Sequence, residues 1–564
     1  MRWTLIEKAD PTKINHIQES IGVDQPIAEL LVKRRIETFE DAKNFFRPSL
    51  DKLHDPFLMK GMQEASDLIL QKRNEKKPVM VFGDYDVDGT TSVALMSTYL
   101  RGLGFEVLSY IPDRYDEGYG ISYKGIDHAK ANGIDLIIAL DCGIKAIEKV
   151  NYAKNLGIDF IICDHHRPGN QIPDAIAVLD PKQEDCNYPY DELCGCGVGF
   201  KLVQALQIKL EKPQKEIYKY LDLVATAIGS DIVPITGENR ILAHFGLKLI
   251  NSRRRPAFKA ILEQTKKKEL TITDVVFMIG PRINAAGRMK HGLLATELLC
   301  ETNLEKVKAL AQDIELYNAS RKDADRSITE EAIQLIKDYK EEERFTTVVY
   351  QSHWHKGVIG IVASRLTETY YRPTLVFTKS GDKLAASARS VKGFDVYDAL
   401  ESSSEFIEQF GGHKYAAGLT LKENNFEKFK TKFEEVVKSS INPDLLTPEI
   451  TYDSEIQFQD ITPKFIRILK QFAPFGPRNM KPTFVSKNVS TTGFVKALGE
   501  EGLHLKTNLL QNGIVITAIG FGLGNKKEIM DLNEPFDIIF TIEENEWNGT
   551  TSLQLNLKDI KESN

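Results

Sequence analysis

The chain has 564 residues, a net charge of −7 and 42% hydrophobic residues. This composition is typical of a globular protein of about three to five folding units and argues against a disordered chain. The acidic balance also excludes a nucleic-acid binder that depends on a basic field over its whole surface, so any site for a polyanion must be locally basic.

The sequence gives no sign of export or membrane insertion. It has no run of about 18 consecutive apolar residues, and the N-terminal MRWTLIEKADPT lacks the apolar core of an export signal. Its six cysteines form no spaced disulfide framework, and Cys194 and Cys196 have no second pair at zinc spacing. We therefore expect a cytoplasmic protein with reduced thiols.

The first half of the chain changes pattern twice. Residues 1–75 are predicted to form an N-terminal helical segment. From 76 to 250, apolar runs of strand length alternate with helical stretches, as in βαβ units around a buried parallel sheet. Residues 251–343 begin as a basic segment, since positions 250–300 hold ten Lys or Arg against four acids. They continue as a long helix that is expected to connect two domains.

The second half contains a smaller α/β unit and then a β-rich region. The α/β unit spans 344–440, and a Pro-containing linker follows at 441–449. In the region 450–564, Gln511-Asn512-Gly513 predicts a hairpin. Five short strands with one helical interruption near 525–532 suit a small barrel such as an OB-fold.

Acidic residues gather at the ends of the predicted strands. The motif GDYDVDGTTS carries Asp84, Asp86 and Asp88 at alternate positions, which places them on one side of an extended chain. Thr90 and Thr91 are expected to cap the helix that follows. Three carboxylates this close repel one another unless cations lie among them.

The same pattern recurs farther along the chain. Asp141 ends the run LIIALD, and Asp164, His165 and His166 follow the run FIIC. Ligand sites of open parallel sheets lie at the carboxyl ends of the strands, so these side chains are expected at one edge. Asp231, after a helical stretch, is a further candidate.

This set of ligand types predicts a metal centre. Mixed carboxylate and imidazole ligands favour Mn²⁺ over Mg²⁺, which prefers oxygen alone. Four or five carboxylates with one bridging aspartate suit two ions about 3.5–4 Å apart, the arrangement used for in-line phosphoryl displacement. We therefore expect two Mn²⁺ ions, with Mg²⁺ as the alternative, and phosphodiester hydrolysis.

A second group of motifs is basic or rich in glycine. Arginine binds phosphate through paired hydrogen bonds, and glycines let backbone N–H groups approach an anion. These motifs are expected to face the metal site from the second α/β unit, although each arginine could instead pair with a structural carboxylate. The candidates for DNA or phosphate binding are Arg114, Arg282, Asn284, Arg288, Arg365, Ser387, Arg389, Gly412 and His413.

Two nucleotide-binding motifs can be set aside. The stretch GCGVGF at 195–200 is similar to a dinucleotide-binding loop, but no predicted strand precedes it. The sequence contains no Gly-x4-Gly-Lys-Ser/Thr motif, so ATP hydrolysis is not indicated.

The acidic motifs resemble those of the DHH phosphoesterase superfamily. Its name motif stands here as Asp164-His165-His166, and GDYDVDG, ALDCG and ATAIGSDIVP match its other acidic motifs. IPDRYDEGYG, VIGIVASR, ASARS and GGHKYAAG resemble motifs of its single-stranded-DNA-specific exonucleases. The resemblance runs from DPFLMKGM to the end of the chain.

The resemblance implies an α/β fold: a parallel-sheet DHH domain joined by a long helix to a smaller α/β DHH-associated domain, plus a C-terminal OB-fold β-barrel. It implies 5′→3′ exonuclease activity on single-stranded DNA by two-metal catalysis, in DNA repair and recombination. Asp141 and His166 would act in catalysis, with Asp84 supporting them. The implied metal ligands are Asp86, Asp88, Asp141, His165 and Asp231.

The resemblance also bears on how DNA is bound and by which partners. Ser387 and Arg389, with Arg114 and Arg282, are the best candidates for a pocket that holds a 5′-terminal phosphate. The expected protein is a monomer that acts on single-stranded DNA, with a single-strand-binding protein and a helicase as cooperating partners. Residues 445–564 hold twelve Lys or Arg against fifteen acids, which makes a weak electrostatic funnel for DNA.

Two other functions remain open at this point. One is a DHH phosphodiesterase acting on short oligonucleotides or cyclic dinucleotides, against which the C-terminal β region argues. The other is a non-catalytic DHH scaffold that only binds DNA, against which the complete set of acidic motifs argues.

Overall fold

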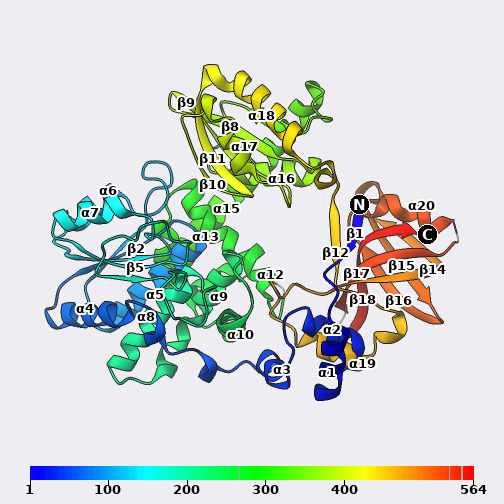
Figure 1. Ribbon diagram of the computed structural model, residues 1–564, viewed down its shortest axis with the longest axis horizontal. Helices are drawn as coiled ribbons and strands as arrows, with labels where there is room; N and C mark the ends of the chain where they lie inside the picture. Colours follow the sequence, from blue (N-terminus) through cyan, green and yellow to red (C-terminus); the bar gives the residue numbers. More distant parts are fainter. Residues whose placement is uncertain (264, 266, 533, 548–549, 564) are drawn as a thin grey trace.

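The computed structural model describes residues 1–564 except 264, 266, 533, 548–549 and 564, so two positions of the basic segment lie outside the described residues. The chain forms three lobes (Figure 1). An α/β lobe lies on the left of the view, a smaller α/β lobe at the top and a β-barrel on the right. This agrees with the predicted fold class.

The first lobe is built on a parallel sheet, as predicted. Its strand order is β3-β2-β4-β5-β6, and all neighbouring strands run parallel. The central strands are continuous apolar runs because helices cover both faces of the sheet. The strands are β2 (Val79–Gly83), β3 (Val107–Tyr110), β4 (Leu136–Leu140), β5 (Asp159–Cys163) and β6 (Ala177–Leu179). The main helices are α4 (Met62–Asn74), α5 (Val87–Gly102), α6 (Tyr123–Ala131), α7 (Ile147–Asn155), α8 (Gly195–Lys209), α9 (Leu221–Ser230) and α10 (Gly237–Ser252).

A helical layer leads from the first lobe to the second. It ends in the predicted long helix, α15 (Leu304–Asp338), whose buried residues pack first against the core of the first lobe and later against that of the second. The shorter helices are α11 (Pro256–Ile261), α12 (Ile272–Asp274), the π-helix Val275–Ile279, α13 (Gly280–Met289) and α14 (Leu293–Cys300).

The second lobe has a mixed sheet of order β10-β11-β9-β8-β7, in which only β7 and β8 run parallel. Its helices include α16 (Ile359–Tyr370), α17 (Val396–Glu401) and α18 (Phe426–Ser440). The strands are β7 (Thr347–Tyr350), β8 (Thr374–Ser380), β9 (Lys383–Arg389), β10 (Gln409–His413) and β11 (Ala416–Lys422).

The third lobe is a closed barrel, as predicted. Strand β14 pairs with both β15 and β17, which closes the sheet. Asn512 and Gly513 both have positive φ in the predicted hairpin, which joins β15 to β16. The elements are β12 (Glu449–Tyr452), β13 (Ser454–Glu455), α19 (Pro463–Lys470), β14 (Thr483–Leu498), β15 (His504–Gln511), β16 (Ile514–Gly520), α20 (Lys527–Asp531), β17 (Phe536–Trp547) and β18 (Thr550–Glu562).

The N-terminal segment is not wholly helical, and most of it belongs to the third lobe. Strand β1 (Arg2–Leu5) pairs in parallel with β12, so the prediction of a helical start is wrong there. Helices α1 (Pro11–Ile21), α2 (Gln25–Val32) and α3 (Phe39–Phe46) share one apolar core with the barrel. Figure 1 shows these helices, in blue, beneath the barrel and far from the first lobe's sheet.

No helix among the described residues combines the length and apolar character needed to span a membrane.

Candidate metal centre and DNA-binding cleft

The predicted acidic residues converge at the carboxyl edge of the first lobe's sheet. Asp141 follows β4, and the Asp164-His165-His166 triplet follows β5. Asp141 has a left-handed backbone, with φ of 61°, and its N–H donates to the carbonyl of Cys163 at 2.8 Å. A left-handed backbone is uncommon outside glycine, and such positions cluster at functional sites.

The three aspartates of GDYDVDG reach this edge by a different route from the predicted one. Strand β2 ends at Gly83, and Asp86 already caps α5 by accepting the N–H of Gly89 at 3.0 Å. Asp88 therefore lies in the first helical turn and not in an extended chain. The prediction that threonines cap this helix is wrong, because the hydroxyl of Thr90 donates back to the Asp86 carbonyl inside the helix.

Asp88 is held by the amino end of α8, a contact that the sequence did not reveal. Its two carboxylate oxygens accept the N–H groups of Gly195 at 2.6 Å and Cys196 at 2.7 Å. A Cβ atom on Gly195 would lie 2.6 Å from the Cβ of Asp141, so only glycine fits beside that aspartate. The GCGVGF stretch thus binds a carboxylate of the site. Its glycine spacing beside Cys194 was the available signal.

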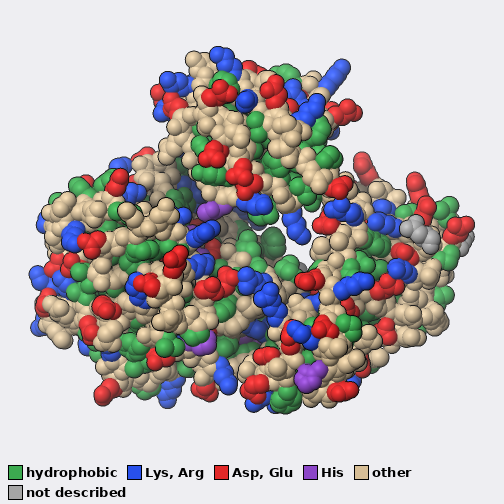
Figure 2. All heavy atoms as spheres, viewed as in Figure 1, with side chains coloured by type: hydrophobic (Ala, Val, Ile, Leu, Met, Phe, Trp, Pro, Cys, Tyr) green, Lys and Arg blue, Asp and Glu red, His purple; other side chains and the backbone are tan. Residues whose placement is uncertain are grey.

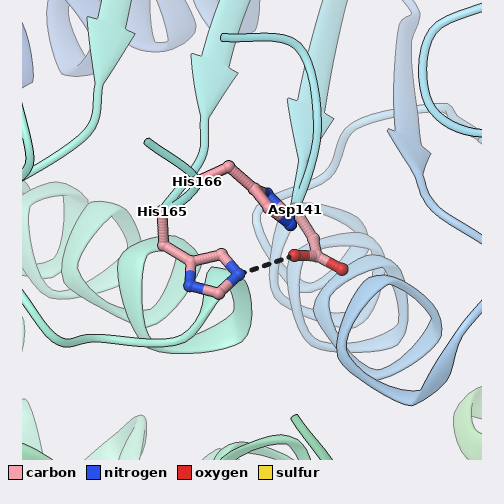
Figure 3. Close-up of side chains that lie close together, drawn as sticks. All are labelled: Asp141, His165 and His166. Atoms are coloured by element: carbon pink, nitrogen blue, oxygen red, sulfur yellow. Dashed lines mark ion pairs between the residues drawn. The ribbon is translucent and has the colours of Figure 1, made fainter. Parts of the chain in front are cut away.

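His165 is the centre of the cluster. Its Nε2 atom lies 3.2 Å from Asp141 Oδ1, 3.5 Å from Asp231 Oδ2 and 3.8 Å from Asp88 Oδ2. Figure 3 shows the imidazole of His165 directed at the Asp141 carboxylate, with the ring of His166 beside the same aspartate; the centroids of the two imidazole rings lie 4.5 Å apart. Asp231 arrives from the carboxyl end of α9. Three chain segments therefore each place one carboxylate around a single ring nitrogen, which His165 supplies from a fourth segment.

Burial and mutual repulsion disfavour the ionised form of these carboxyls. Burial, followed by the charges of neighbouring aspartates, raises the pKa of Asp84 and Asp231 to about 8 and that of Asp88 to about 7. The same causes raise the pKa of Asp141 well above its ordinary value. A bound divalent cation would remove this repulsion.

Several polar atoms at this edge also make no hydrogen bond within the described residues. Asp84 Oδ2 and both ring nitrogens of His165 are buried and have no hydrogen bond from the described residues. Two overlapping sets meet the spacing needed to hold an ion: Asp141 with both histidines, and Asp88 with His165 and Asp231. Because burial lowers the pKa of His165 to about 3, its imidazole is neutral and available as a ligand. The donor set therefore fits a divalent metal such as Mn²⁺.

His166 differs from its neighbour. Its Nδ1–H donates to Asp164 Oδ1 at 2.7 Å, and its Nε2 lies 3.1 Å from the hydroxyl of Tyr119. Burial opposes the charge on this ring, but the hydrogen bond and the charge of Asp164 outweigh it and raise the pKa of His166 to about 9. The two adjacent histidines thus divide into one neutral ring and one cationic ring.

The raised carboxyl pKa values predict a pH-dependent stability of the metal-free protein. Unfolded aspartates titrate near pH 3.9, whereas these titrate near pH 7–8 when folded, so the folded state binds more protons between those values. Stability is therefore expected to fall as the pH rises from about 4 to about 8. Thermal unfolding in chelator at pH 6 and pH 9 should show a midpoint several degrees lower at pH 9. Added Mn²⁺ should reverse the loss, and Asp141→Asn should reduce it. A midpoint with the same pH dependence in Asp141→Asn would contradict this explanation.

Two of the candidate phosphate-binding arginines pair with the long helix α15. Arg282 Nε lies 2.5 Å from Glu315 Oε2, and Arg365 Nη2 lies 2.7 Å from Asp325 Oδ2. The structural alternative considered for each arginine is thus present at these two positions. Part of the charge of both guanidinium groups is therefore already neutralised.

Three other candidate arginines, Arg114, Arg288 and Arg389, form no ion pair with a carboxylate among the described residues. Arg288 is partly buried, and among the described residues its guanidinium donates to the carbonyl of Gly357, across the first two lobes, at 2.9 Å. Arg389 donates to the carbonyl of Ala388. Burial, and for Arg288 the charges of Arg114, Arg321 and Arg389, lower the pKa of both guanidinium groups, that of Arg288 to about 10. A partly buried cluster of cations without counter-charge is suited to bind an anion.

The polar neighbours of these arginines have spare hydrogen-bonding capacity. Arg114 stacks over the ring of Tyr85 at 3.8 Å, and its Nε is buried without a hydrogen bond from the described residues. The same holds for Asn284 Oδ1 and for Arg321 Nε. Ser387 and Arg389 both lie next to Gly360. A Cβ atom on Gly360 would be 3.3 Å from Ser387 Oγ and 3.1 Å from Arg389 Nη2, so these two side chains are neighbours.

The glycine-rich hairpin lies at the same edge of the second sheet. The strand register places His413 opposite Ala416, and Ala416 opposite Arg389. Gly412 has φ of 146°, and a Cβ there would lie 2.4 Å from the carbonyl of Ala416, so this glycine is needed to form the hairpin. His413 is exposed and stands free of side-chain contacts in the described set.

The sequence analysis missed three residues of the site. The hydroxyl of Tyr119 hydrogen-bonds with His166 and with the Asp141 carbonyl. Tyr119 lies in the motif IPDRYDEGYG, in which no role was predicted for this tyrosine. Asp180 follows β6 as a further buried acid, whose pKa burial raises to about 7. Arg321 joins the cation cluster from α15, where a charged helical residue gave no signal.

Known protein families match the three lobes in turn. The DHH family, N-terminal domain, matches residues 78–228, the DHHA1 domain matches 343–439, and the RecJ OB domain matches 452–559. The single-stranded-DNA-specific exonuclease RecJ of Bacillus subtilis is 34% identical over 563 residues, which cover 99% of this chain and 70% of that protein. The Escherichia coli protein of the same name is 32% identical over 529 residues, or 89% of this chain and 90% of that one.

The chain belongs to the RecJ family.

The fold agrees with that of a solved RecJ family member. The structure of RecJ in complex with Mn²⁺ from Thermus thermophilus matches with a TM-score of 0.85 and 26% identity, covering 100% of this chain and 80% of that one. A structure of exonuclease RecJ bound to manganese matches with a TM-score of 0.61 and 30% identity, covering 70% of this chain and 98% of that one. Divalent metal binding therefore occurs among RecJ structures of the same fold.

Proposed function

We propose that the protein is a metal-dependent exonuclease that hydrolyses single-stranded DNA from its 5′ end. The observation that carries this proposal is the pairing of two opposite sites. His165 gathers Asp88, Asp141 and Asp231 at the edge of the first sheet, while Arg288 and Arg389 lie without counter-charge across the lobes. Membership of a family whose named members are single-stranded-DNA-specific exonucleases supports it.

The metal centre that we propose holds two Mn²⁺ ions, with Mg²⁺ as a substitute. When bound, such ions neutralise the charge on the attacked phosphate and lower the pKa of water. Asp141 would belong to both ion sites, and Asp84 would support them from the buried side of the edge. The remaining ligands would be Asp86, Asp88, His165 and Asp231.

The chain's own residues provide the other requirements of hydrolysis. His166, cationic through its bond with Asp164, is suited to face a phosphate oxygen or to give a proton to the leaving oxygen. Tyr119, bonded to both His166 and the Asp141 carbonyl, orients that imidazole. Arg288, Asn284 and Arg365 would bind the backbone of the strand, and His413 and Gly412 would meet it from the second lobe.

The test of the activity is manganese-dependent release of nucleotides from a long, labelled single strand. Nucleotide release from long strands supports the exonuclease. Cleavage restricted to oligonucleotides of a few residues, or to cyclic dinucleotides, would favour the small-substrate phosphodiesterase. Binding of a long strand without cleavage in Mn²⁺ would favour the non-catalytic scaffold.

The polarity of digestion requires a group that recognises a 5′ end. We assign this role to Ser387 and Arg389, with Arg114 and Arg282 as further contributors, because a hydroxyl and the unpaired guanidinium groups of Arg389 and Arg114 together suit a terminal phosphate dianion. Arg282 would contribute by exchanging its ion pair with Glu315 for the phosphate. Replacing Arg389 with alanine is expected to slow digestion of 5′-phosphorylated strands about tenfold or more, and that of 5′-hydroxyl strands much less. Initial rates on matched pairs of strands measure this difference.

Arg365→Ala is the matched control for this variant, because Arg365 already pairs with Asp325 on α15. It should reduce both rates by similar factors. The Mn²⁺ affinity of Arg389→Ala should remain unchanged. An equal fractional loss on both substrates in Arg389→Ala would assign this arginine to the fold or to the general path of the backbone.

In the cell, we propose that the protein acts as a cytoplasmic monomer in DNA repair and recombination. Its cooperating partners would be a single-strand-binding protein and a helicase, which supply and maintain single strands. All six cysteines are free in the structure, consistent with a reducing compartment.

A further inference from the structure

A loop of the third lobe contacts the first lobe beside its metal-type ligands. This loop spans residues 471–479, with the sequence QFAPFGPRN, and lies between α19 and β14. Its ends are held together by Asn479, which is buried and donates to the carbonyls of Phe472 and Pro474 at 2.8 Å each. We refer to it below as the 471–479 loop.

The loop meets the chain segment that carries Asp231. The N–H of Ile235 donates to the carbonyl of Pro477 at 2.9 Å. A Cβ atom on Gly476 would lie 2.5 Å from Ile235 Cγ1, so the two chains are in the closest contact that glycine allows. Ile235 is almost completely buried, at 1% exposure, and it follows Asp231 by only four residues.

The backbone between Asp231 and Ile235 is constrained, so a displacement of one of these residues is passed on to the other. Ile232 has φ of 59°, a value that β-branched residues rarely adopt, and its side chain is exposed. Pro234 fixes its own φ, and its carbonyl accepts the side-chain N–H of Asn239 at 3.1 Å. A shift of Ile235 would therefore move the Asp231 carboxylate rather than being absorbed between them.

Arg240, on the first turn of α10, fixes the same contact from the other side. Its guanidinium is buried and donates to five backbone carbonyl oxygens, of Phe45 and of residues 471–474, at 2.8–3.4 Å. It also stacks on the ring of Phe45 at 3.8 Å. One side chain of the first lobe thus binds the loop and the end of α3 together.

A second segment of the metal site touches the loop through an ion pair. Arg478 Nη2 lies 2.9 Å from Glu192 Oε1. The carbonyl of Glu192 accepts the side-chain N–H of Asn239 at 2.5 Å, which joins this segment to the Asp231 segment. Three residues after Glu192, the N–H of Gly195 begins the pair of amides that hold Asp88.

We infer that the 471–479 loop is a positioning element of the metal centre, through which the barrel sets the places of Asp231 and Asp88. It contacts no metal-type ligand directly. It holds the two segments that bear Asp231 and the Asp88-binding amides at a fixed separation. The inference rests on the proposed function, which identifies the centre as a metal site. Its consequence is that the affinity for Mn²⁺ depends on the position of the barrel relative to the first lobe.

Two substitutions in the loop test this role. Gly476→Val introduces atoms where Ile235 now lies and should weaken Mn²⁺ binding about tenfold, as loss of outer-shell support does at metal sites. Arg478→Asn removes the ion pair with Glu192 while tolerating the positive φ of 58° at that position, and should weaken binding a few-fold. Binding is measured by titrating the intact, DNA-free protein with Mn²⁺, with thermal unfolding recorded for each variant.

Lys481→Asn is the matched control. It removes an ion pair of similar length, 2.7 Å to Glu543, that lies wholly within the barrel. It should leave Mn²⁺ affinity at the wild-type value. In the nuclease assay, excess Mn²⁺ should restore most of the rate of the two loop variants, which a general loss of folding would not allow.

The outcomes separate the two proposals. Unchanged Mn²⁺ affinity in a folded Arg478→Asn and Gly476→Val overturns the positioning role, as does an equal loss in Lys481→Asn. If Gly476→Val does not fold, the comparison of the Mn²⁺ affinity of Arg478→Asn with that of Lys481→Asn decides the question. A third outcome is that the wild-type protein binds Mn²⁺ but does not digest single strands, while the loop variants bind Mn²⁺ more weakly than the wild type. That outcome would support the positioning role and overturn the proposed exonuclease activity.

Discussion

Replacing Asp141 with alanine is expected to reduce hydrolysis of single-stranded DNA to less than about 1% of the wild-type rate, because in the proposed two-ion centre Asp141 is shared by both ions and its loss removes the activated water. Of the three carboxylates around His165 Nε2, that of Asp141 is the nearest, at 3.2 Å, and Asp141 follows the central strand β4 with a left-handed backbone. The fold should survive. In the absence of metal, removing one of several repelling carboxyls should leave the thermal midpoint unchanged or raise it.

The measurement is the initial rate of nucleotide release in Mn²⁺, together with the unfolding midpoint with and without the ion. Asp159→Ala is the matched control, since Asp159 begins the neighbouring strand β5 at the opposite edge of the sheet. It should retain wild-type activity. If Asp141→Ala kept more than a few per cent of the wild-type rate, Asp141 would not be a bridging ligand.

Blunt duplex DNA is expected to be digested about 100-fold more slowly than a single strand, because a duplex cannot bring its end into the geometry that the site requires. Figure 2 shows Lys and Arg side chains gathered around a hollow between the three lobes. The first two lobes touch beside it, where Arg288 donates to the Gly357 carbonyl and Tyr115 donates to the Arg288 carbonyl at 2.5 Å. The prediction requires a passage beside these contacts that admits one backbone and excludes a duplex.

The substrates for this test share one labelled strand: free, in a blunt duplex, and in a duplex with a 5′ single-stranded tail. The tailed duplex should be digested at a rate near that of the free strand, at least until the tail is consumed. Binding should weaken as salt rises, since phosphate contacts release counterions. Comparable initial rates on the blunt duplex and the free strand would refute the passage as the cause of strand selection.

The sequence predicted the parts of the site that follow from sheet geometry. Asp141 and the Asp164-His165-His166 triplet had to meet, because parallel strands present their carboxyl ends at one edge. The prediction that Asp88 lies in an extended chain at a strand end is wrong, because Asp88 reaches the site from the first turn of a helix. Local spacing could not distinguish a strand end from a helix start at that point.

Contacts between residues far apart in the sequence could not be predicted. The amides that hold Asp88 come from Gly195 and Cys196, more than a hundred residues away. Likewise, nothing in the local sequence of Arg282 and Arg365 distinguished them from the unpaired Arg389. Their acids lie on a helix whose charged faces all looked alike. Pairing partners across a fold depend on packing, which periodicity does not encode.

The shared core of the N-terminal helices and the barrel has a consequence for how the protein is made. Buried residues such as Ile17 and Leu30 leave the ribosome long before their partners, which run from Ile456 to Ile560. At roughly 5–20 residues per second, the apolar faces of α1–α3 wait on the order of tens of seconds for the barrel. During that time the first two lobes can fold, while the leading segment depends on chaperones or on transient contacts. Shortened versions that omit the barrel should therefore also omit the first three helices, because either part alone exposes an aggregation-prone surface.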